Sequence, residues 1–258
     1  GAIYFSNSGG QCVLYGVCGN DCCTTSSSSY QFGYISVNNA ISSKNYINYS
    51  SIVRCVNANS GSDTLWIING NVLCPSINMS MNKCLYRPVF LCNPFIDTSS
   101  ITCSISYSSF TDNNALDCLC LQFEKGGAKY EMKCCNILRN TQDTSSWGLI
   151  YACGSLNIKD CCILENKAMY IFYANNHPYI ITLSNCTVDK TSSYGSFIIQ
   201  NTITKSFIHG LHHISTQNCN AKYDLVRTLS SAKIKKKTKV ENLIVKKNDV
   251  RVFVFLCN

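Results

Sequence analysis

The chain has 258 residues, of which 46% are apolar and only 14% are charged. Such an apolar content excludes disorder for most of the chain, and the abundance of Ser, Asn, Ile, Tyr and Cys over strong helix formers argues against a helical bundle. No run approaches the about 20 consecutive apolar residues that a membrane-spanning helix needs. The chain opens on Gly1 rather than Met, and we expect it to be part of a longer protein.

The net charge of +8 is concentrated in the C-terminal part of the chain. Residues 1–221 sum to +1, with 12 basic and 11 acidic side chains, whereas residues 222–258 sum to +7, with 10 basic and 3 acidic side chains. A main body of this charge has no basic face, so we expect no nucleic-acid partner. The basic run at 233–239 lies between two strand-like stretches, and we interpret it as a corner loop.

In chain order, residues 1–45 have a less regular pattern than the rest. From there on, a tetrad made of an apolar residue, two variable positions and Asn recurs at intervals of 23 to 31 residues. A stretch rich in β-branched and aromatic residues precedes each tetrad, and a second such stretch follows it after a few polar residues. The tetrads that end in Asn do so at Asn59, Asn82, Asn113, Asn140, Asn166 and Asn248. Two further repeats have a substituted tetrad, which runs from Thr187 to Lys190 and from Ile214 to Gln217.

Each repeat therefore supplies two short strands and polar corners, with no helical pattern between them. Strands this short cannot bury a core alone, but they can when each one pairs in parallel with its equivalent about 4.8 Å away in the next repeat. The pattern predicts an all-β chain that forms a parallel β-helix of about 8–9 coils, as a single domain over 1–258. A two-sheet sandwich is the alternative, because it also has many short strands.

The repeat predicts two kinds of stacked side chain. The Asn residues are expected to form a structural ladder at the corners, because Asn tolerates unusual backbone angles and its amides can bond from coil to coil. Among the 19 cysteines, Cys162 is expected to stack on Cys186, and Cys135 on Cys161. Their spacing suits a disulfide in an oxidising compartment, and stacked reduced thiols are the alternative.

The opening GAIYF and the FTDN segment at 110–113 resemble the GGAI and FxxN repeats of polymorphic outer membrane proteins. Cys- and Asn-rich versions of these proteins occur at the surface of parasitic protists. The resemblance implies a right-handed parallel β-helix with the pectate-lyase-like fold, displayed at the cell surface or secreted, with an adhesive role. Only Phe110 and Asn113 match FxxN literally, and the GAI motif occurs once.

Enzymatic chemistry on such a fold needs clustered carboxylates, a bound cation or a basic residue pair. The acidic residues at the expected corners are instead scattered singly: Asp112, Asp143, Asp160, Glu165 and Asp189. The one histidine cluster is His209, His212 and His213, and a strand would bring only two of these three together. We therefore expect no catalytic residues, no cofactor and no bound metal.

The leading functional hypothesis is a non-enzymatic scaffold that displays variable loops as an adhesin. Its expected partners are host or cell-surface glycans or proteins, and its expected location is the cell surface or the extracellular space. A polysaccharide lyase or hydrolase on the same fold is one alternative, and a truncated gene product without independent function is another. Because the apolar stretch 250–256 has no polar cap, self-association through the ends is also expected.

Overall fold

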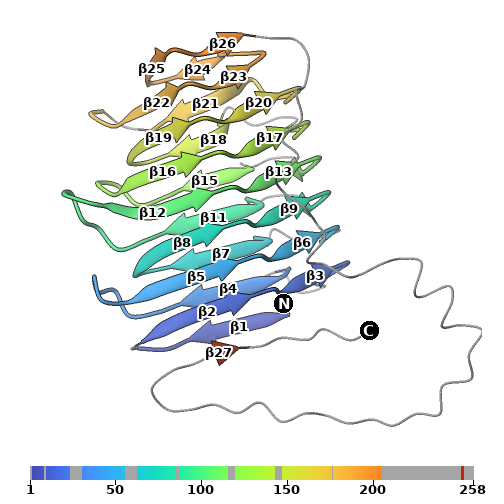
Figure 1. The fold of residues 1–258 in the computed structure, drawn as a ribbon, viewed down its shortest axis with the longest axis vertical. Coiled ribbons are helices and arrows are strands. Elements are labelled where there is room, and N and C mark those ends of the chain that lie inside the picture. The colour runs from blue at the N-terminus through green and yellow to red at the C-terminus, as the bar shows by residue number, and fades with distance from the viewer. Residues whose placement is uncertain are drawn as a thin grey trace, which may run out of the picture.

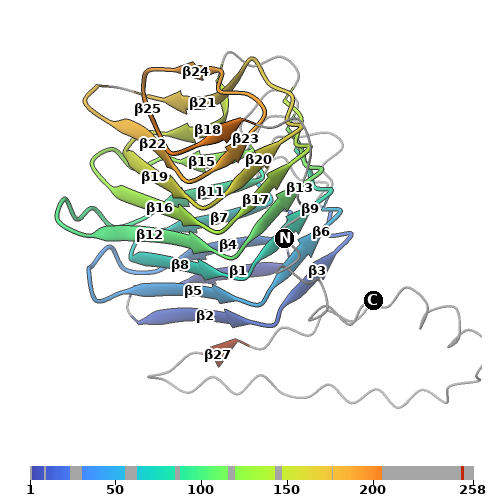
Figure 2. The ribbon, with the colours of Figure 1, turned by 45° about the horizontal axis from the view of Figure 1, so that its top comes forward.

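The structure is a computed structural model, and it describes residues 2–8, 10–23, 31–55, 63–84, 88–115, 120–142, 147–175, 177–204 and 251–252. All regular elements in these residues are strands. The chain visits three sheets, here called A, B and C, in the same order again and again, so that each circuit forms one coil stacked on the coil before it (Figure 1). Figure 2 shows these three sheets facing a common interior.

Sheet A has eight strands and is made of the first strand of each coil. Its members are β1 (Ile3–Ser6), β4 (Gly33–Ser36), β7 (Leu65–Ile68), β11 (Phe90–Asn93), β15 (Leu121–Phe123), β18 (Gly148–Ala152), β21 (Tyr170–Ala174) and β24 (Ser193–Tyr194).

Sheet B has nine strands and contains the longest ones. Its members are β2 (Gln11–Tyr15), β5 (Lys44–Asn48), β8 (Asn71–Pro75), β12 (Ile101–Ser106), β16 (Lys129–Lys133), β19 (Ser155–Lys159), β22 (Ile180–Ser184), β25 (Ser196–Gln200) and β27 (Arg251–Val252). The last of these pairs with β2, so residues 251–252 lie beside the first coil.

Sheet C has eight short strands, and a two-stranded sheet lies next along the chain in two of the coils. The members of sheet C are β3 (Cys18–Asn20), β6 (Ser51–Val53), β9 (Asn78–Ser80), β13 (Ser109–Thr111), β17 (Asn136–Leu138), β20 (Cys162–Leu164), β23 (Thr187–Val188) and β26 (Ile203–Thr204). The small sheet pairs β10 (Lys83–Cys84) with β14 (Asn114–Ala115).

Strand pairing throughout the described residues is parallel and joins each strand to its equivalent one coil away. The all-β prediction is therefore confirmed, and the arrangement is consistent with a β-solenoid. The sandwich alternative does not fit, because hairpins and Greek keys would pair strands in antiparallel. Residues 1–45, expected to be less regular, contain β1 to β3 as a complete coil in register with the next one.

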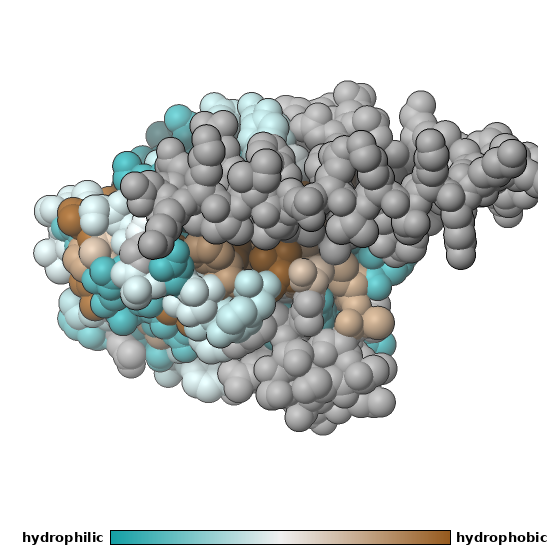
Figure 3. All heavy atoms as spheres, turned by 90° about the horizontal axis from the view of Figure 1, so that it is seen from below, coloured by the Kyte–Doolittle hydropathy of each residue, from teal (hydrophilic) through white to brown (hydrophobic). Residues whose placement is uncertain are grey.

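Alternation of side chains along the strands fills the interior. In β5, β8, β19 and β22 every second residue is buried, which is the period of a strand with one face in the core. Successive coils add their inward residues to one continuous apolar cluster. At the end of the stack that carries β1 and β2, apolar residues show in the middle of the molecular surface, with hydrophilic ones beside them (Figure 3).

The corner between sheets C and A depends on one residue with a left-handed backbone. This residue directly precedes each of the four Asn residues from Asn82 to Asn166, and φ is 56° at Met81, 56° at Asp112, 54° at Arg139 and 58° at Glu165. The unusual backbone angle was expected at the Asn itself, and that expectation is wrong. The side-chain amide, rather than backbone tolerance, is therefore what the Asn contributes.

The basic run at 233–239 and most of the C-terminal segment lie outside the described residues. Within the part of the chain that the structure describes, no helix is long and apolar enough to cross a membrane.

Candidate functional site

The structure brings Asn82, Asn113, Asn140 and Asn166 together as a buried ladder. The Nδ2 group of each Asn donates to Oδ1 of the next one, at 3.0, 2.9 and 3.1 Å along the stack. Each Oδ1 also accepts the backbone N–H of the equivalent residue in the preceding coil, as Asn113 does from Asn82 at 3.0 Å. Each Nδ2 donates in addition to a strand carbonyl of that coil, as Asn113 does to Met79 at 2.9 Å. The buried amides therefore satisfy one another and the backbone.

Cys55 occupies the position in the ladder that the sequence assigned to Asn59. The strand register aligns Ile52 with Met79, three residues before Cys55 and Asn82 respectively, and the backbone N–H of Cys55 donates to Asn82 Oδ1 at 2.9 Å. The tetrad that ends at Asn59 was therefore aligned four residues too late. Asn59 itself and Asn248 lie outside the described residues.

Cys135, Cys161 and Cys186 form a single column at the corner between sheets B and C. The register that aligns Asn136 with Cys162 and Cys162 with Thr187 places these three cysteines one residue earlier, in consecutive coils. The expected stacking of Cys135 on Cys161 is present. The expected stacking of Cys162 on Cys186 is wrong by one residue, because the tetrad in that coil begins at Val188 rather than Thr187.

These column thiols act as hydrogen-bonding groups. The Sγ atoms of Cys135, Cys161 and Cys186 donate to the carbonyl two residues earlier, at 3.2, 3.0 and 3.2 Å. Ser108 occupies the same column one coil earlier, and its hydroxyl donates to the Ser106 carbonyl at 2.8 Å. Its Oγ also accepts a backbone N–H from the preceding coil, as Cys161 Sγ does. Cys therefore replaces Ser at this corner, and the four cysteines expected to form disulfides are free thiols in the structure.

An aromatic column runs along the outer face of sheet A, and the sequence analysis did not identify it. The register places one residue of each coil in this column, and six of its eight members are aromatic. In chain order the members of the aromatic column are Tyr4, Tyr34, Trp66, Leu91, Gln122, Tyr151, Tyr173 and Tyr194.

The rings of the aromatic column contact one another at both ends of the sheet. Tyr4 stacks on Tyr34, with ring centroids 5.4 Å apart. At the other end Tyr151, Tyr173 and Tyr194 stack in series, with centroid distances of 5.5 and 4.5 Å and interplanar angles of 19° and 15°. Tyr151 is almost fully buried in this stack, whereas Tyr194 at its end is 52% exposed. The stack therefore ends in an accessible phenol ring.

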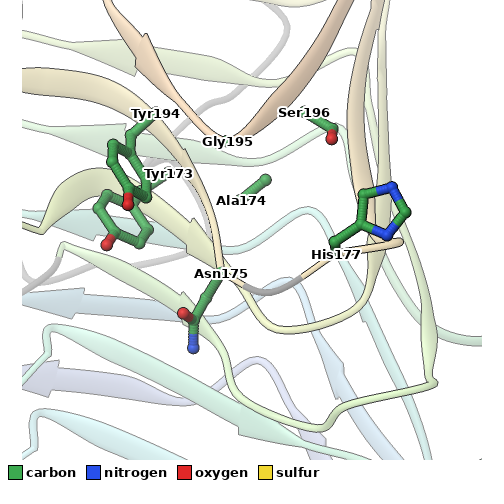
Figure 4. A pocket seen from close by; sticks show the side chains of 7 residues that line it. All are labelled: Tyr173, Ala174, Asn175, His177, Tyr194, Gly195 and Ser196. Carbon is green, nitrogen blue, oxygen red and sulfur yellow. The ribbon is translucent and has the colours of Figure 1, made fainter.

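A hollow of about 360 Å³ lies beside the exposed end of this stack. Figure 4 shows the rings of Tyr173 and Tyr194 on one side of the hollow and His177 on the other. The remaining lining residues are Ala174, Asn175, Gly195 and Ser196. Gly195 has φ of 79°, and a Cβ there would lie 2.2 Å from the Ala174 carbonyl oxygen. Only glycine therefore fits at this position in the lining of the hollow.

The polar side chains at the hollow are two phenol hydroxyls, an amide, a serine hydroxyl and an imidazole. No carboxylate or ammonium is among the seven residues that line it. Burial raises the pKa of the Tyr173 hydroxyl, and the Tyr194 ring beside it acts in the same direction. Asn175 Nδ2 donates to the hydroxyl of Tyr151, which fixes this amide at the edge of the hollow. Two aromatic rings with a few fixed, uncharged polar groups are typical of a site for a neutral, polar organic ligand.

Of the carboxylates considered for catalysis, Asp112, Glu165 and Asp189 lie along the corner between sheets C and A, where Arg139 lies between Asp112 and Glu165. Asp112 forms a two-pronged ion pair with Arg139 of the next coil, at 2.7 and 2.8 Å. Asp189 accepts the backbone N–H of Glu165, and Asp160 lies at the other corner, between sheets B and C. Asp143 and the histidines at 209, 212 and 213 lie outside the described residues. Among the described residues no group of three or more His, Cys, Asp or Glu side chains could hold a metal ion.

A comparison of the chain with family models, with curated proteins and with solved structures finds no match in any of the three.

Proposed function

We propose that the chain is a right-handed parallel β-helix of the polymorphic outer membrane protein kind, displayed at the cell surface or secreted, where it acts as an adhesin. Three stacked parallel sheets and the GAI and FxxN motifs support this assignment. A ladder-bonded stack is rigid and long, and it presents the same outer face in every coil. Such a scaffold suits the display of a binding surface better than an enclosed catalytic site.

The ligand that we propose is a neutral glycan, and the single observation that carries this proposal is the aromatic column ending at the hollow. A pyranose ring has an apolar C–H face and a rim of hydroxyls. The exposed ring of Tyr194 offers an apolar platform, and Asn175, His177 and Ser196 offer neutral partners for the hydroxyls. Because the lining residues include no Lys or Arg side chain, the hollow offers no ion pair to an acidic glycan or a phosphate.

The proposed non-enzymatic role is supported by how the corner carboxylates are used. Asp21 and Asp112 both hold an Arg of the next coil in a two-pronged ion pair. Glu131 faces Lys159 at 3.6 Å. These acidic groups stabilise the contact between coils, which is a structural use.

The test is a binding titration against a panel of neutral oligosaccharides built from hexoses and N-acetylhexosamines. The substitution Tyr194→Ala should weaken the binding of whichever oligosaccharide is retained by about tenfold, since removing a central aromatic contact costs about 1–2 kcal/mol. The matched control is Tyr15→Ala, because Tyr15 is 57% exposed on sheet B and belongs to a separate aromatic pair with Tyr49. Absence of binding across the panel, or equal loss in both variants, would contradict the glycan proposal.

A further inference from the structure

Two buried cysteines of one coil face each other across the corner between sheets A and B. Cys92 lies in β11 and Cys103 in β12, and neither side chain is accessible to solvent. Their Sγ atoms are 3.1 Å apart, which is closer than the van der Waals contact of two sulfurs. A disulfide would need these atoms to approach by about 1 Å more, since the S–S bond is about 2.05 Å long.

The surroundings of this pair differ from those of the column thiols at the corner between sheets B and C. Cys135, Cys161 and Cys186 each donate to a backbone carbonyl, so oxidation there would remove a hydrogen bond that the corner uses. Among the described residues the thiols of Cys92 and Cys103 make no hydrogen bond except with each other. Oxidation of this pair therefore sacrifices no contact to the backbone.

We propose that Cys92 and Cys103 form a disulfide when the protein folds in an oxidising compartment. The oxidant is a small-molecule disulfide such as oxidised glutathione, and exchange proceeds through a mixed disulfide. In total two thiols and one glutathione disulfide give one protein disulfide and two molecules of glutathione, so two hydrogens and two electrons leave the protein. The bond closes the loop of residues 93–102 and fixes sheet A to sheet B within one coil.

Cys74 is the competing partner, because it belongs to the same interior cluster of sheet B and sheet A residues. Its thiol is fully buried, and this burial, with a smaller effect of the nearby Cys103 thiol, raises its pKa. The sulfur contact that the structure contains is nevertheless between Cys92 and Cys103. The proposal therefore predicts one defined pair and a free Cys74.

The experiment is peptide mapping of wild-type protein refolded in a glutathione redox buffer. Free thiols are alkylated after unfolding in urea without reductant, and the digest is analysed by mass spectrometry. We expect a peptide containing Cys92 linked to one containing Cys103, lighter than the two peptides together by the mass of two hydrogens, and an alkylated Cys74. Alkylation of all three cysteines, or a link from Cys74 to either one, would overturn the proposal.

A second measurement uses the stability of variants. Reductant should lower the urea midpoint of the oxidised wild type by about 1 M, because the opened loop regains conformational freedom in the unfolded state. The matched control Cys74→Ala should show the same response to reductant, whereas Cys92→Ala and Cys103→Ala should respond less than the wild type, because reductant can then cleave only the disulfide that the structure contains at Cys18. Equal responses in all four proteins would contradict the assignment. The peptide mapping needs only the wild-type protein, and its outcome does not depend on whether a glycan binds.

Discussion

Replacing Asn113 by Ala tests the physical role of the Asn ladder, because Asn113 lies in its middle. The amide makes four hydrogen bonds: it donates to Met79 O and Asn140 Oδ1, both at 2.9 Å, and it accepts from the backbone and side-chain nitrogens of Asn82, both at 3.0 Å. All these groups are buried. With a net value of about 1 kcal/mol per bond, and more where a buried group is left unpaired, Asn113→Ala should cost about 4–6 kcal/mol.

The assay is urea unfolding at equilibrium, and its matched control is Asn157→Ala. Asn157 is half-buried in β19 on the outer face of sheet B, and it is not part of the ladder. Its substitution should change the free energy of unfolding by no more than about 0.5 kcal/mol. If Asn113→Ala costs less than about 1 kcal/mol, or no more than the control, the ladder contributes little and this reasoning is refuted.

Two further predictions concern single contacts. Arg139→Ala should lower the free energy of unfolding by less than about 1 kcal/mol, because the side chains of Arg139 and Asp112 are 44% and 41% exposed. Most of that loss should disappear in high salt. A larger loss in urea unfolding that does not depend on salt would contradict this prediction. A hydrogen bond from the Cys55 thiol lowers the pKa of Cys22 to about 7. The rate at which iodoacetamide alkylates Cys22 should therefore increase as pH rises through about 7 and then become constant. Cys12 is the control: burial raises its pKa to about 12, so this thiol should remain unlabelled in the folded protein. An alkylation rate of Cys22 that still increases above pH 9 would contradict the lowered pKa of Cys22.

The architecture was predictable because it depends on patterns that repeat along the chain. Three local features recur in every typical repeat: strands with alternating buried residues, polar corners, and an Asn three residues after an apolar residue. These features predict the four ladder residues from Asn82 to Asn166. Errors arose where a coil lacks the amide. In the coil with Cys55 the start of the tetrad was placed at Val56 rather than Ile52, and in the coil with Val188 it was placed at Thr187 rather than Val188. A shift of one residue moves a side chain to the other face of the strand, and the predicted Cys162–Cys186 pair failed for this reason.

The aromatic column escaped the sequence analysis although its signal is present. Aligning the first strands of the coils gives IYF, GYI, LWI, FLC, LQF, IYA, FYA and SYG, with an aromatic residue in the middle of six. A core is predicted from the inward residues of the strands, whereas the aromatic column faces outward. The hollow beside Tyr194 was not predictable, because its lining combines residues of two neighbouring coils, such as His177 of one and Ser196 of the next.

The most direct test of the account is a crystal structure of the protein with a neutral oligosaccharide selected from the binding panel. The account predicts three parallel sheets with a sugar ring lying against the exposed face of Tyr194 and its hydroxyls bonded to Asn175, His177 or Ser196. A sugar bound elsewhere, with the hollow empty, would contradict the proposed site. Sheets paired in antiparallel would contradict the architecture on which the site depends.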